Sequence, residues 1–209
     1  YNGLDYSSLS SNQNLSKELS LRPNHLIIGM IARVHPWKGQ SYFIDLAEAL
    51  LQKKSALTFI MVGDAYPGNE YLYDELNAKL ETLGLKSHFI NLGYREDIIA
   101  ILNTLDLFIL PSTAPDPFPT VILEAMSCQK TVIATAQGGA LEMIEHQVSG
   151  IHIPPDNAQE AAKIIFPYLS DKKIRRAMGQ VAQQKVNADF SLVSFEKNIM
   201  QLLTVIHER

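Results

Sequence analysis

Two carboxylates, Asp116 and Glu124, lie eight positions apart in the middle of the chain, in different surroundings. Asp116 is in the proline-rich segment 111–119, whereas Glu124 lies in the otherwise apolar segment 121–126. Burying a carboxylate is unfavourable unless hydrogen bonds or a positive charge replace its water. Glu124 is therefore either a ligand-binding group or one that caps or salt-bridges a neighbouring helix, and the local sequence leaves both interpretations open.

Two cations, Arg33 and Lys38, precede Gly39 in a segment that follows an apolar run. Arginine offers a planar fork of donors and lysine a point charge, a combination that suits phosphate oxygens. The segments at Gly39, Thr120 and Gly139 each lead into a predicted helix, whose free N–H groups and dipole would also attract an anion. The alternative is that both cations are ordinary solvated surface charges.

Several other chemistries lack their sequence motif. The chain has no G-x-G-x-x-G, no Walker lysine motif and no G-x-S-x-G, so the usual NAD site, an ATPase and a hydrolase nucleophile are not predicted. The six histidines are scattered without zinc-ligand spacing, and we predict no metal site. His35 lies between the two cations, but a polar loop histidine is the simpler interpretation.

The residues just described must be positioned by a regular alternation of short apolar segments and helical patterns. Six segments are predicted strands: His25–Ala32, Leu57–Val62, His88–Leu92, Asp106–Leu110, Thr131–Ala134 and Ser149–Ile153. They lack strict polar–apolar alternation, as expected for strands covered on both faces. The pattern predicts an α/β fold, a Rossmann-like, doubly wound parallel sheet of about six strands with helices on both faces.

Ligands of such sheets bind outside the carboxyl ends of the strands, so the residues after each strand are the informative ones. These exits carry glycines, cations and carboxylates: Arg33 to Gly39, Gly63-Asp64, Gly93-Tyr94-Arg95, Pro111 to Asp116, and Thr135 to Gly139. We therefore expect one ligand site at this edge of the sheet.

Apolar spacings of three and four residues predict the helices. The first two have their apolar faces at Phe43, Leu46, Ala47 and Leu50, and at Leu72, Leu76, Leu80 and Leu83, where Gly84 ends the helix. A helix over 157–166 should break or kink at Pro167, and another should span 171–187. The last should begin at a Ser191 cap and carry the apolar stripe Phe195, Ile199, Leu202, Leu203 and Ile206.

Composition excludes several classes of protein. The 209 residues are 46% hydrophobic and 19% charged, and the net charge of −4 argues against a nucleic-acid partner. No apolar run approaches the roughly 18 residues of a membrane span, and no signal peptide is recognisable. The single cysteine, Cys128, fits a reducing compartment and should be a small buried thiol. We expect a cytoplasmic protein whose full-length form could be membrane-peripheral.

The motifs at the predicted strand exits resemble, in order and spacing, those of the retaining glycosyltransferases of family four. They are Arg33-x4-Lys38-Gly39, Val62-Gly63-Asp64, Gly93-Tyr94-Arg95-Glu96-Asp97, Pro111-Ser112, Asp116-x7-Glu124-Ala125-Met126 and Gly138-Gly139-x2-Glu142. The opening Tyr1-Asn2-Gly3-Leu4-Asp5 is similar to the segment where this family's chain leaves its N-terminal acceptor domain. The resemblance covers essentially the whole chain and implies the C-terminal half of a GT-B fold.

The resemblance also implies residue roles. Glu124 corresponds to the second acid of the family's E-x7-E motif, which hydrogen-bonds the ribose of a nucleotide sugar, and Asp116 to the first, which faces the donor sugar. Arg33 and Lys38 match the pair that neutralises the diphosphate, and these four residues would carry catalysis. The nucleotide-binding set is completed by Gly63, Gly93, Tyr94, Arg95, Phe118, Thr120 and Val121, with backbone groups of 93–95 bordering the base.

Two residues depart from the family pattern. Asp116 replaces the usual glutamate, so its carboxylate reaches one methylene less far. Pro119 stands where glycine is common; proline suits the first position of a helix but donates no hydrogen bond to a ligand.

The implied protein is a hexosyltransferase-like enzyme of polysaccharide biosynthesis that uses a UDP-, GDP- or ADP-sugar with retention and requires no metal or other cofactor. The acceptor, a sugar or lipid-linked glycan, would bind an N-terminal domain outside this sequence, so we expect the chain alone to be inactive. Residues 1–24 would be the interdomain linker, 25–190 the donor-binding domain, and 191–209 a helix packing on either domain. Two alternatives stay open: a non-catalytic nucleotide-sugar-binding module and a nucleotide-sugar epimerase of the same fold.

Overall fold

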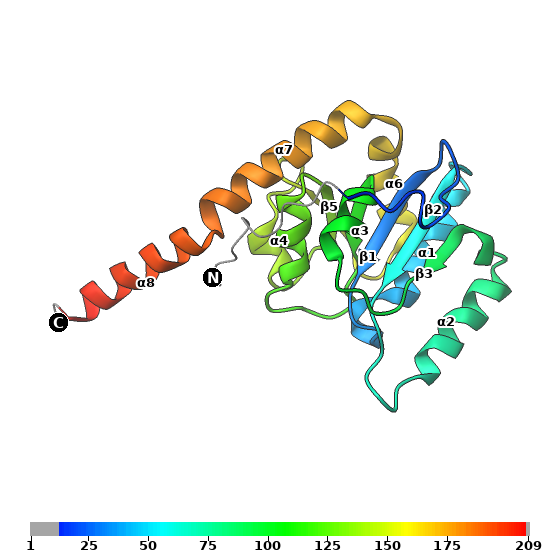
Figure 1. Ribbon diagram of the computed structural model, residues 1–209, viewed down its shortest axis with the longest axis horizontal. Helices are drawn as coiled ribbons and strands as arrows, with labels where there is room; N and C mark the ends of the chain where they lie inside the picture. Colours follow the sequence, from blue (N-terminus) through cyan, green and yellow to red (C-terminus); the bar gives the residue numbers. More distant parts are fainter. Residues whose placement is uncertain (1–12, 208–209) are drawn as a thin grey trace.

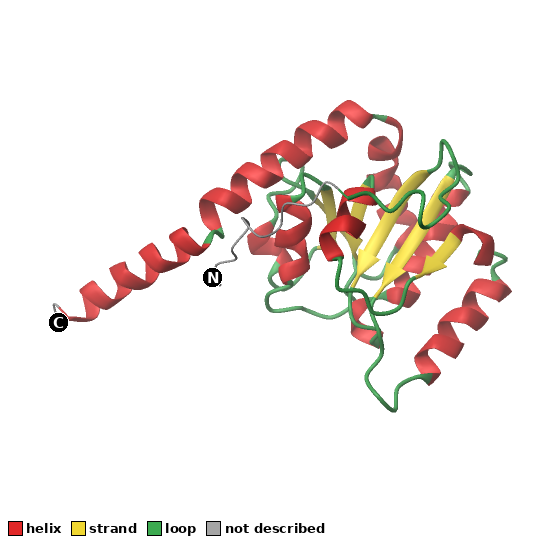
Figure 2. Ribbon diagram, in the orientation of Figure 1, coloured by secondary structure: helices red, strands yellow, loops and turns green. Residues whose placement is uncertain are grey.

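The predicted parallel sheet is present and has six strands (Figures 1 and 2). A computed structural model describes residues 13–207, and the segment 1–5 used in the family resemblance lies outside them. The strands are β1 (Leu26–Ile31), β2 (Leu57–Val62), β3 (Phe89–Asn91), β4 (Leu107–Leu110), β5 (Thr131–Thr135) and β6 (Ile151–Ile153). Each overlaps the apolar segment predicted for it.

The strand order is β3-β2-β1-β4-β5-β6, and every neighbouring pair is parallel. The chain runs outward from β1 through β2 to β3, and then crosses back to place β4 beside β1, with Ile28 opposite Leu107. The direction of winding therefore reverses between β1 and β4. A crevice opens outside the carboxyl ends of the strands at such a switch point.

Eight helices connect or follow the strands in the described part of the chain. They are α1 (Gln40–Leu51), α2 (Tyr71–Thr82), α3 (Ile98–Thr104), α4 (Thr120–Ser127), α5 (Ala140–Met143), α6 (Ala158–Ser170), α7 (Lys172–Asp189) and α8 (Leu192–His207), with short 3₁₀ turns η2 (Pro36–Lys38) and η3 (Lys86–His88). Gly84 follows α2 with φ +66°, as expected for a helix end. The expected break at Pro167 was wrong: α6 continues to Ser170.

Strand side chains alternate between two apolar cores. Leu26, Ile28 and Met30 of β1 pack with α1, α2 and α6, whereas Ile27 and Ile31 pack with α3, α4 and the second half of α7. This alternation follows from the pleat of the strand, and it explains why strands buried on both faces show no strict alternation of polar and apolar residues in the sequence.

The C-terminal helix α8 projects away from the sheet and touches the domain mainly through α7 (Figure 1). It begins after Ser191, whose hydroxyl accepts a hydrogen bond from the Ser194 N–H at 3.2 Å, as expected for a cap. Val193, Met200 and Leu203 on α8 are more than half exposed. Among the described residues, none of the helices combines the length and apolarity needed to cross a membrane.

Candidate functional site

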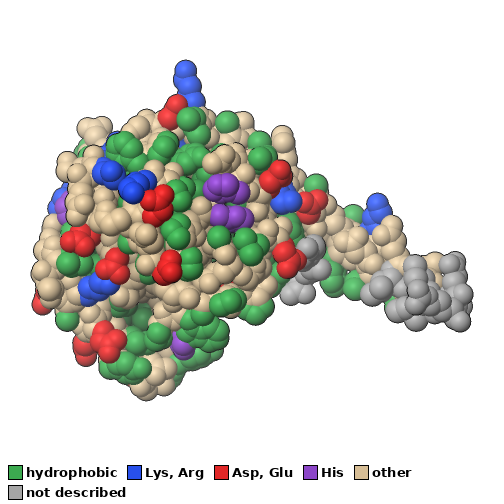
Figure 3. Space-filling model, turned by 180° about the vertical axis from the view of Figure 1, so that it is seen from behind, with side chains coloured by type: hydrophobic (Ala, Val, Ile, Leu, Met, Phe, Trp, Pro, Cys, Tyr) green, Lys and Arg blue, Asp and Glu red, His purple; other side chains and the backbone are tan. Residues whose placement is uncertain are grey.

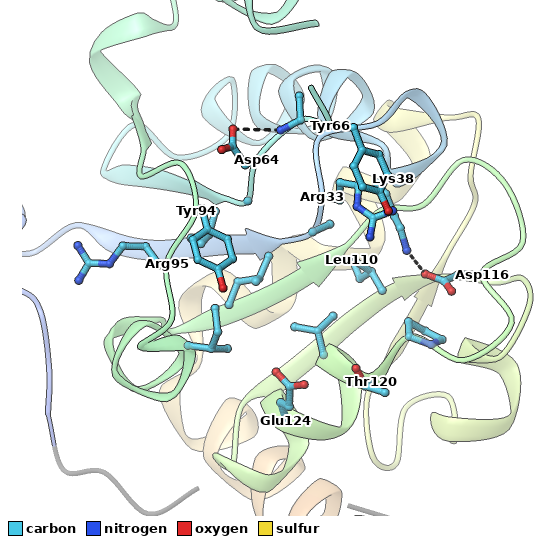
Figure 4. A pocket seen from close by; sticks show the side chains of 18 of the residues that line it. Arg33, Lys38, Asp64, Tyr66, Tyr94, Arg95, Leu110, Asp116, Thr120 and Glu124 are labelled. Atoms are coloured by element: carbon cyan, nitrogen blue, oxygen red, sulfur yellow. Dashed lines mark hydrogen bonds and ion pairs between the residues drawn. The ribbon is translucent and has the colours of Figure 1, made fainter. Parts of the chain in front are cut away.

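A cavity of about 540 Å³ lies at the carboxyl ends of β1, β2 and β4, where the winding reverses (Figure 4). Its walls come from the loops after these strands, the loop after β3 and the first turns of α4. Nineteen residues line it: Ile31, Ala32, Arg33, Lys38, Val62, Gly63, Asp64, Ala65, Tyr66, Tyr94, Arg95, Ile98, Leu110, Asp116, Phe118, Pro119, Thr120, Val121 and Glu124.

Arg33 follows β1 and is held from two directions. The buried side chain of Gln40, in the first turn of α1, donates a hydrogen bond from Nε2 to the Arg33 carbonyl at 2.8 Å. The Arg33 guanidinium lies over the ring of Tyr66, with 3.9 Å from Cζ to the ring centroid (Figure 4). A cation stacked on an aromatic face is fixed in position while its N–H groups remain free for an anion.

The loop after β1 is bound tightly to the loop after β4. Gly39 has φ +82°, and a Cβ there would lie 1.8 Å from the Pro111 carbonyl oxygen, so only glycine permits this approach. The N–H of Thr113 donates to the Trp37 carbonyl at 2.9 Å. These contacts place Lys38 opposite the proline-rich loop that carries Asp116.

Lys38 and Asp116 form an ion pair across the cavity (Figure 4). The Asp116 carbonyl accepts a hydrogen bond from the Gly139 N–H at 2.7 Å, and a Cβ on Gly138 would lie 2.4 Å from that carbonyl oxygen. The Gly138-Gly139 turn after β5 therefore supports the loop of Asp116 from behind. Three strand exits that are far apart in sequence meet at Asp116.

Glu124 lies one turn into α4 and faces the cavity from the side opposite Arg33 (Figure 4). Burial raises the pKa of its carboxyl, and a hydrogen bond with the Thr120 side chain lowers the pKa by less. Glu124 is only partly exposed, as its apolar sequence neighbours indicate. Pro119 occupies the N-cap position, with ψ 90°, and Thr120 begins the helix.

The loop after β3 contributes the exposed ring of Tyr94, and Arg95 holds this loop in place through its ion pairs. Tyr94 is 68% exposed and directs its ring into the cavity (Figure 4). The Arg95 side chain points away and binds Asp97 twice, at 2.7 and 2.6 Å, and Glu18 at 3.1 Å. Arg95 can therefore meet a ligand only through its backbone, the role that the family resemblance implied for 93–95.

All but one of the predicted site residues line this cavity; Gly93 lies next to it. The sequence reasoning missed Tyr66, which lies four residues after the end of β2, and Ile98 at the start of α3. His35, left as a polar loop residue, accepts at Nε2 a hydrogen bond from the Trp37 indole at 2.8 Å. In residues 13–207 no group of three His, Cys, Asp or Glu side chains could hold a metal ion.

Cys128 lies outside the site as the C-cap of α4. It is half-buried rather than fully buried, and burial raises the pKa of its thiol. A thiol whose pKa is raised is a poor nucleophile, so this residue adds no reactive group to the cavity.

Comparison with known proteins decides the family. Residues 11–185 match the family model described as glycosyl transferases group 1. The chain belongs to this family. Its fold and the motif order identified above are those of GT-B glycosyltransferases.

Three relatives of this family member are informative. The chain is 32% identical over 161 residues to N,N'-diacetylbacillosaminyl-diphospho-undecaprenol alpha-1,3-N-acetylgalactosaminyltransferase of Campylobacter jejuni, covering 76% of this chain and 39% of that one. It is 36% identical to Anabaena HepE solved with UDP-glucose (TM-score 0.88), covering 98% of this chain and 56% of HepE. It is 27% identical to the C-terminal domain of the group 1 glycosyl transferase LpcC of Francisella tularensis (TM-score 0.79), covering 91% of this chain and 100% of that one.

The chain thus spans less than half the length of curated relatives such as the LpcC mannosyltransferase of Rhizobium leguminosarum, of which it covers 48%.

Basic and acidic side chains are interspersed on the face shown in Figure 3, and the described ones form no continuous basic strip there. The continuous basic surface of a duplex-binding protein is therefore not seen on that face.

Proposed function

We propose that this chain is the donor-binding half of a retaining glycosyltransferase, which holds a UDP-sugar in the cavity and transfers the sugar to an acceptor bound by a second domain. The observation that carries the proposal is the convergence of Arg33, Lys38, Asp116 and Glu124 on one cavity at the switch point of the sheet. HepE was solved with UDP-glucose, and its 36% identity over 98% of this chain favours UDP over GDP or ADP.

Arg33 and Lys38 stabilise the leaving group of the proposed reaction, the nucleoside diphosphate. Cleavage of the bond between sugar and diphosphate leaves additional negative charge on the β-phosphate, and groups that bind this charge best in the transition state accelerate the step. Arg33 and Lys38 face the cavity, and the N–H groups of Thr120 and Val121 lie at the positive end of α4. These groups balance the charge without a metal ion, so the proposed reaction is metal-independent and should persist in the presence of EDTA.

The two acids orient the donor at its ends. Glu124 accepts hydrogen bonds from the ribose hydroxyls, while the backbone of Gly93, Tyr94 and Arg95 borders the base. Asp116 faces the sugar, and the ligand's diphosphate takes over the Lys38 ammonium from the Asp116 carboxylate. This exchange is possible because Lys38 and Asp116 side chains are 30% and 17% exposed, respectively, and so reachable from the cavity.

The acceptor side is proposed to lie in a second domain. The apolar side chains of Val193, Met200 and Leu203 on α8 are available to pack against it. This domain leaves them exposed, because α8 contacts it mainly through α7. The Campylobacter relative is named for an undecaprenol-diphosphate-linked acceptor, which supports a lipid-linked glycan as the acceptor class. The chain alone should bind donor and transfer nothing.

Calorimetric titration with UDP, GDP, ADP and UDP-glucose tests the proposal. UDP and UDP-glucose should bind most tightly, and Glu124→Ala and Arg33→Ala should each weaken them by roughly tenfold or more, since each removes hydrogen bonds to or from a charged group. Glu75→Ala and Arg22→Ala are matched controls, because both residues are exposed and lie outside the cavity. Equal binding by Glu124→Ala, Arg33→Ala and the controls would remove the assigned site.

Product analysis separates the proposal from related activities. With the acceptor domain joined to this chain, a retained anomeric configuration in the glycoside product is expected by proton NMR. An epimerised or hydrolysed sugar without acceptor would indicate an epimerase, and donor binding without any turnover would indicate a binding module.

A further inference from the structure

The cavity that contains Arg33, Lys38, Asp116 and Glu124 is the proposed donor cavity. A second cavity, of about 140 Å³, lies on the opposite edge of the sheet from the donor cavity. It is lined by Leu105, Asp106, Gln129, Lys130, Thr131, Lys172, Arg175 and Arg176. Asp106 precedes β4, Thr131 begins β5 and Lys172 begins α7, so the cavity belongs to the amino ends of these elements. Figure 2 shows the corner between α6 and α7 at the end of the sheet away from the strand arrowheads.

The charges of this second cavity are unbalanced. Four of its lining side chains are cations (Lys130, Lys172, Arg175 and Arg176) and one, Asp106, is an anion. Three of the cations lie in the first turns of α7, where the helix dipole is itself positive. The N-cap Asp171 offsets part of this charge, but its carboxylate accepts hydrogen bonds from the Lys173 and Ile174 N–H groups and does not line the cavity.

Arg175 is the fixed element of the cavity. It is 7% exposed, and its Nη1 donates to the Tyr168 carbonyl at 2.7 Å. Its Nη2 lies 3.7 Å from the Asp106 carboxylate, beyond hydrogen-bond distance, so within residues 13–207 this nitrogen has donors to spare. A buried guanidinium with unused donors facing a cavity is suited to bind an oxyanion.

Lys130 adds a second partly buried cation. Its ammonium donates to the carbonyls of Asn103 and Leu105 at 3.2 and 3.1 Å, and burial lowers its pKa. Lys172 and Arg176 are exposed, and neither forms an ion pair within the described part of the chain. The rim of the cavity therefore carries two cations that are free to reach a ligand.

We propose that this second cavity binds a phosphate monoester group. A guanidinium fork and lysine point charges suit its oxygens, and the doubly negative charge of the group matches the excess of cations better than a carboxylate would. The cavity of about 140 Å³ has room for a phosphate group, and on the same measure it is far smaller than the cavity of about 540 Å³ proposed for the nucleotide sugar. The phosphate can belong to a small metabolite or to a lipid headgroup.

Titrations with UDP at saturation, so that the donor cavity is occupied, test this site with three probes. They are inorganic phosphate, glycerol 3-phosphate, and phosphatidylcholine vesicles with and without phosphatidic acid. Saturable binding of at least one phosphate probe is expected, and the double variant Lys172→Gln/Arg176→Gln should weaken it by about tenfold or more. Both replaced residues are exposed, so the fold should be unaffected, which an unchanged UDP affinity will check.

The matched control is Lys86→Gln/Lys163→Gln, which removes two exposed lysines elsewhere on the surface. Binding of soluble phosphates that only Lys172→Gln/Arg176→Gln weakens supports the site and a metabolite source. Binding of phosphatidic acid vesicles alone, with the same dependence on the variants, supports the site and a lipid source. Absence of saturable binding to all three probes, or equal weakening by both double variants, overturns the proposal.

Discussion

The ammonium of Lys38 pairs with the carboxylate of Asp116 across the donor cavity. The pair joins the loop after β1 to the loop after β4, the two strands between which the winding of the sheet reverses. Each of the two charges is satisfied by the other. A diphosphate that enters must compete with Asp116 for Lys38. Removing the charge of Lys38 and removing the charge of Asp116 should therefore change nucleotide affinity in opposite directions.

The first prediction concerns this competition. Lys38→Gln should weaken UDP binding by roughly ten- to a hundredfold, because a hydrogen bond to a charged group contributes about 1.5–3 kcal/mol. Asp116→Asn should tighten UDP binding, because it removes the competing anion and leaves Lys38 free, while transfer by the two-domain enzyme should fall. Calorimetry and initial rates measure the two effects separately.

Lys79→Gln is the matched control for Lys38→Gln. Lys79 also forms an ion pair, with Asp45, and its side chain is 27% exposed against 30% for Lys38. It lies outside the cavity, so its loss should leave UDP affinity unchanged. Weaker UDP binding by Asp116→Asn would show that the pair supports the bound ligand instead of competing with it.

The second prediction uses the pKa of Glu124, which burial raises above its ordinary value of 4.5. The folded protein then keeps the proton to a higher pH than the unfolded chain, so stability from this group is present at low pH and decreases as pH rises through the raised pKa. Glu124→Gln should therefore raise the Tm at pH 7, by an amount that shrinks towards pH 4, and should weaken UDP binding. Thermal unfolding from pH 4 to 8 measures this.

Glu75→Gln on α2 is the control, because this carboxylate is exposed and lies outside the cavity. Its Tm should follow that of the original protein at every pH. If Glu124→Gln lowers the Tm at pH 7, then hydrogen bonds of the ionised carboxylate outweigh its burial, and the assigned origin of the pKa shift is wrong.

The sheet and the edge that carries the cavity could be predicted from the sequence, for physical reasons. Strands buried on both faces are largely apolar, as 59–62 and 107–110 are, and parallel strands bring all their exits to one edge. Lys38, Asp116 and Glu124 follow such strands or begin the next helix, so their shared location follows from topology. The family resemblance adds an expectation that topology cannot give, the chemical partner of each residue, and this expectation stays a prediction.

Other features could not be predicted, because tertiary contacts decide them. Helix α3 (Ile98–Thr104) is short and buried at Ala100, Ile101 and Leu102, so it shows no amphipathic period. Pro167 was expected to interrupt α6, but the helix accommodates it three residues before its end. Tyr66 stacks on Arg33 from a different loop, and no spacing rule connects the two residues.

The third prediction tests how tightly the loops must approach. Gly39→Ala should destabilise the protein by at least about 2 kcal/mol, because it adds steric overlap with Pro111 to the strain of a positive φ. Gly68→Ala is the control: Gly68 has φ +90°, but a Cβ there meets nothing within 4 Å, so it should cost only about 1 kcal/mol of strain. Denaturant unfolding compares them, and equal losses would show that contact with Pro111 is not the constraint.

The fourth prediction concerns the stacking of Arg33 on Tyr66. A cation over an aromatic ring at a partly exposed site contributes about 0.5–1 kcal/mol and, here, holds the guanidinium in the cavity. Tyr66→Ala should therefore weaken UDP binding about two- to fivefold, whereas Tyr66→Phe, which keeps the ring, should bind normally. Tyr71→Ala serves as the control, since Tyr71 is 53% exposed against 50% for Tyr66 but lies outside the cavity. In the double variant Arg33→Ala/Tyr66→Ala the effect of Tyr66 should disappear, because the ring acts on the ligand through Arg33; a fully additive loss would instead mean that Tyr66 contacts the nucleotide directly.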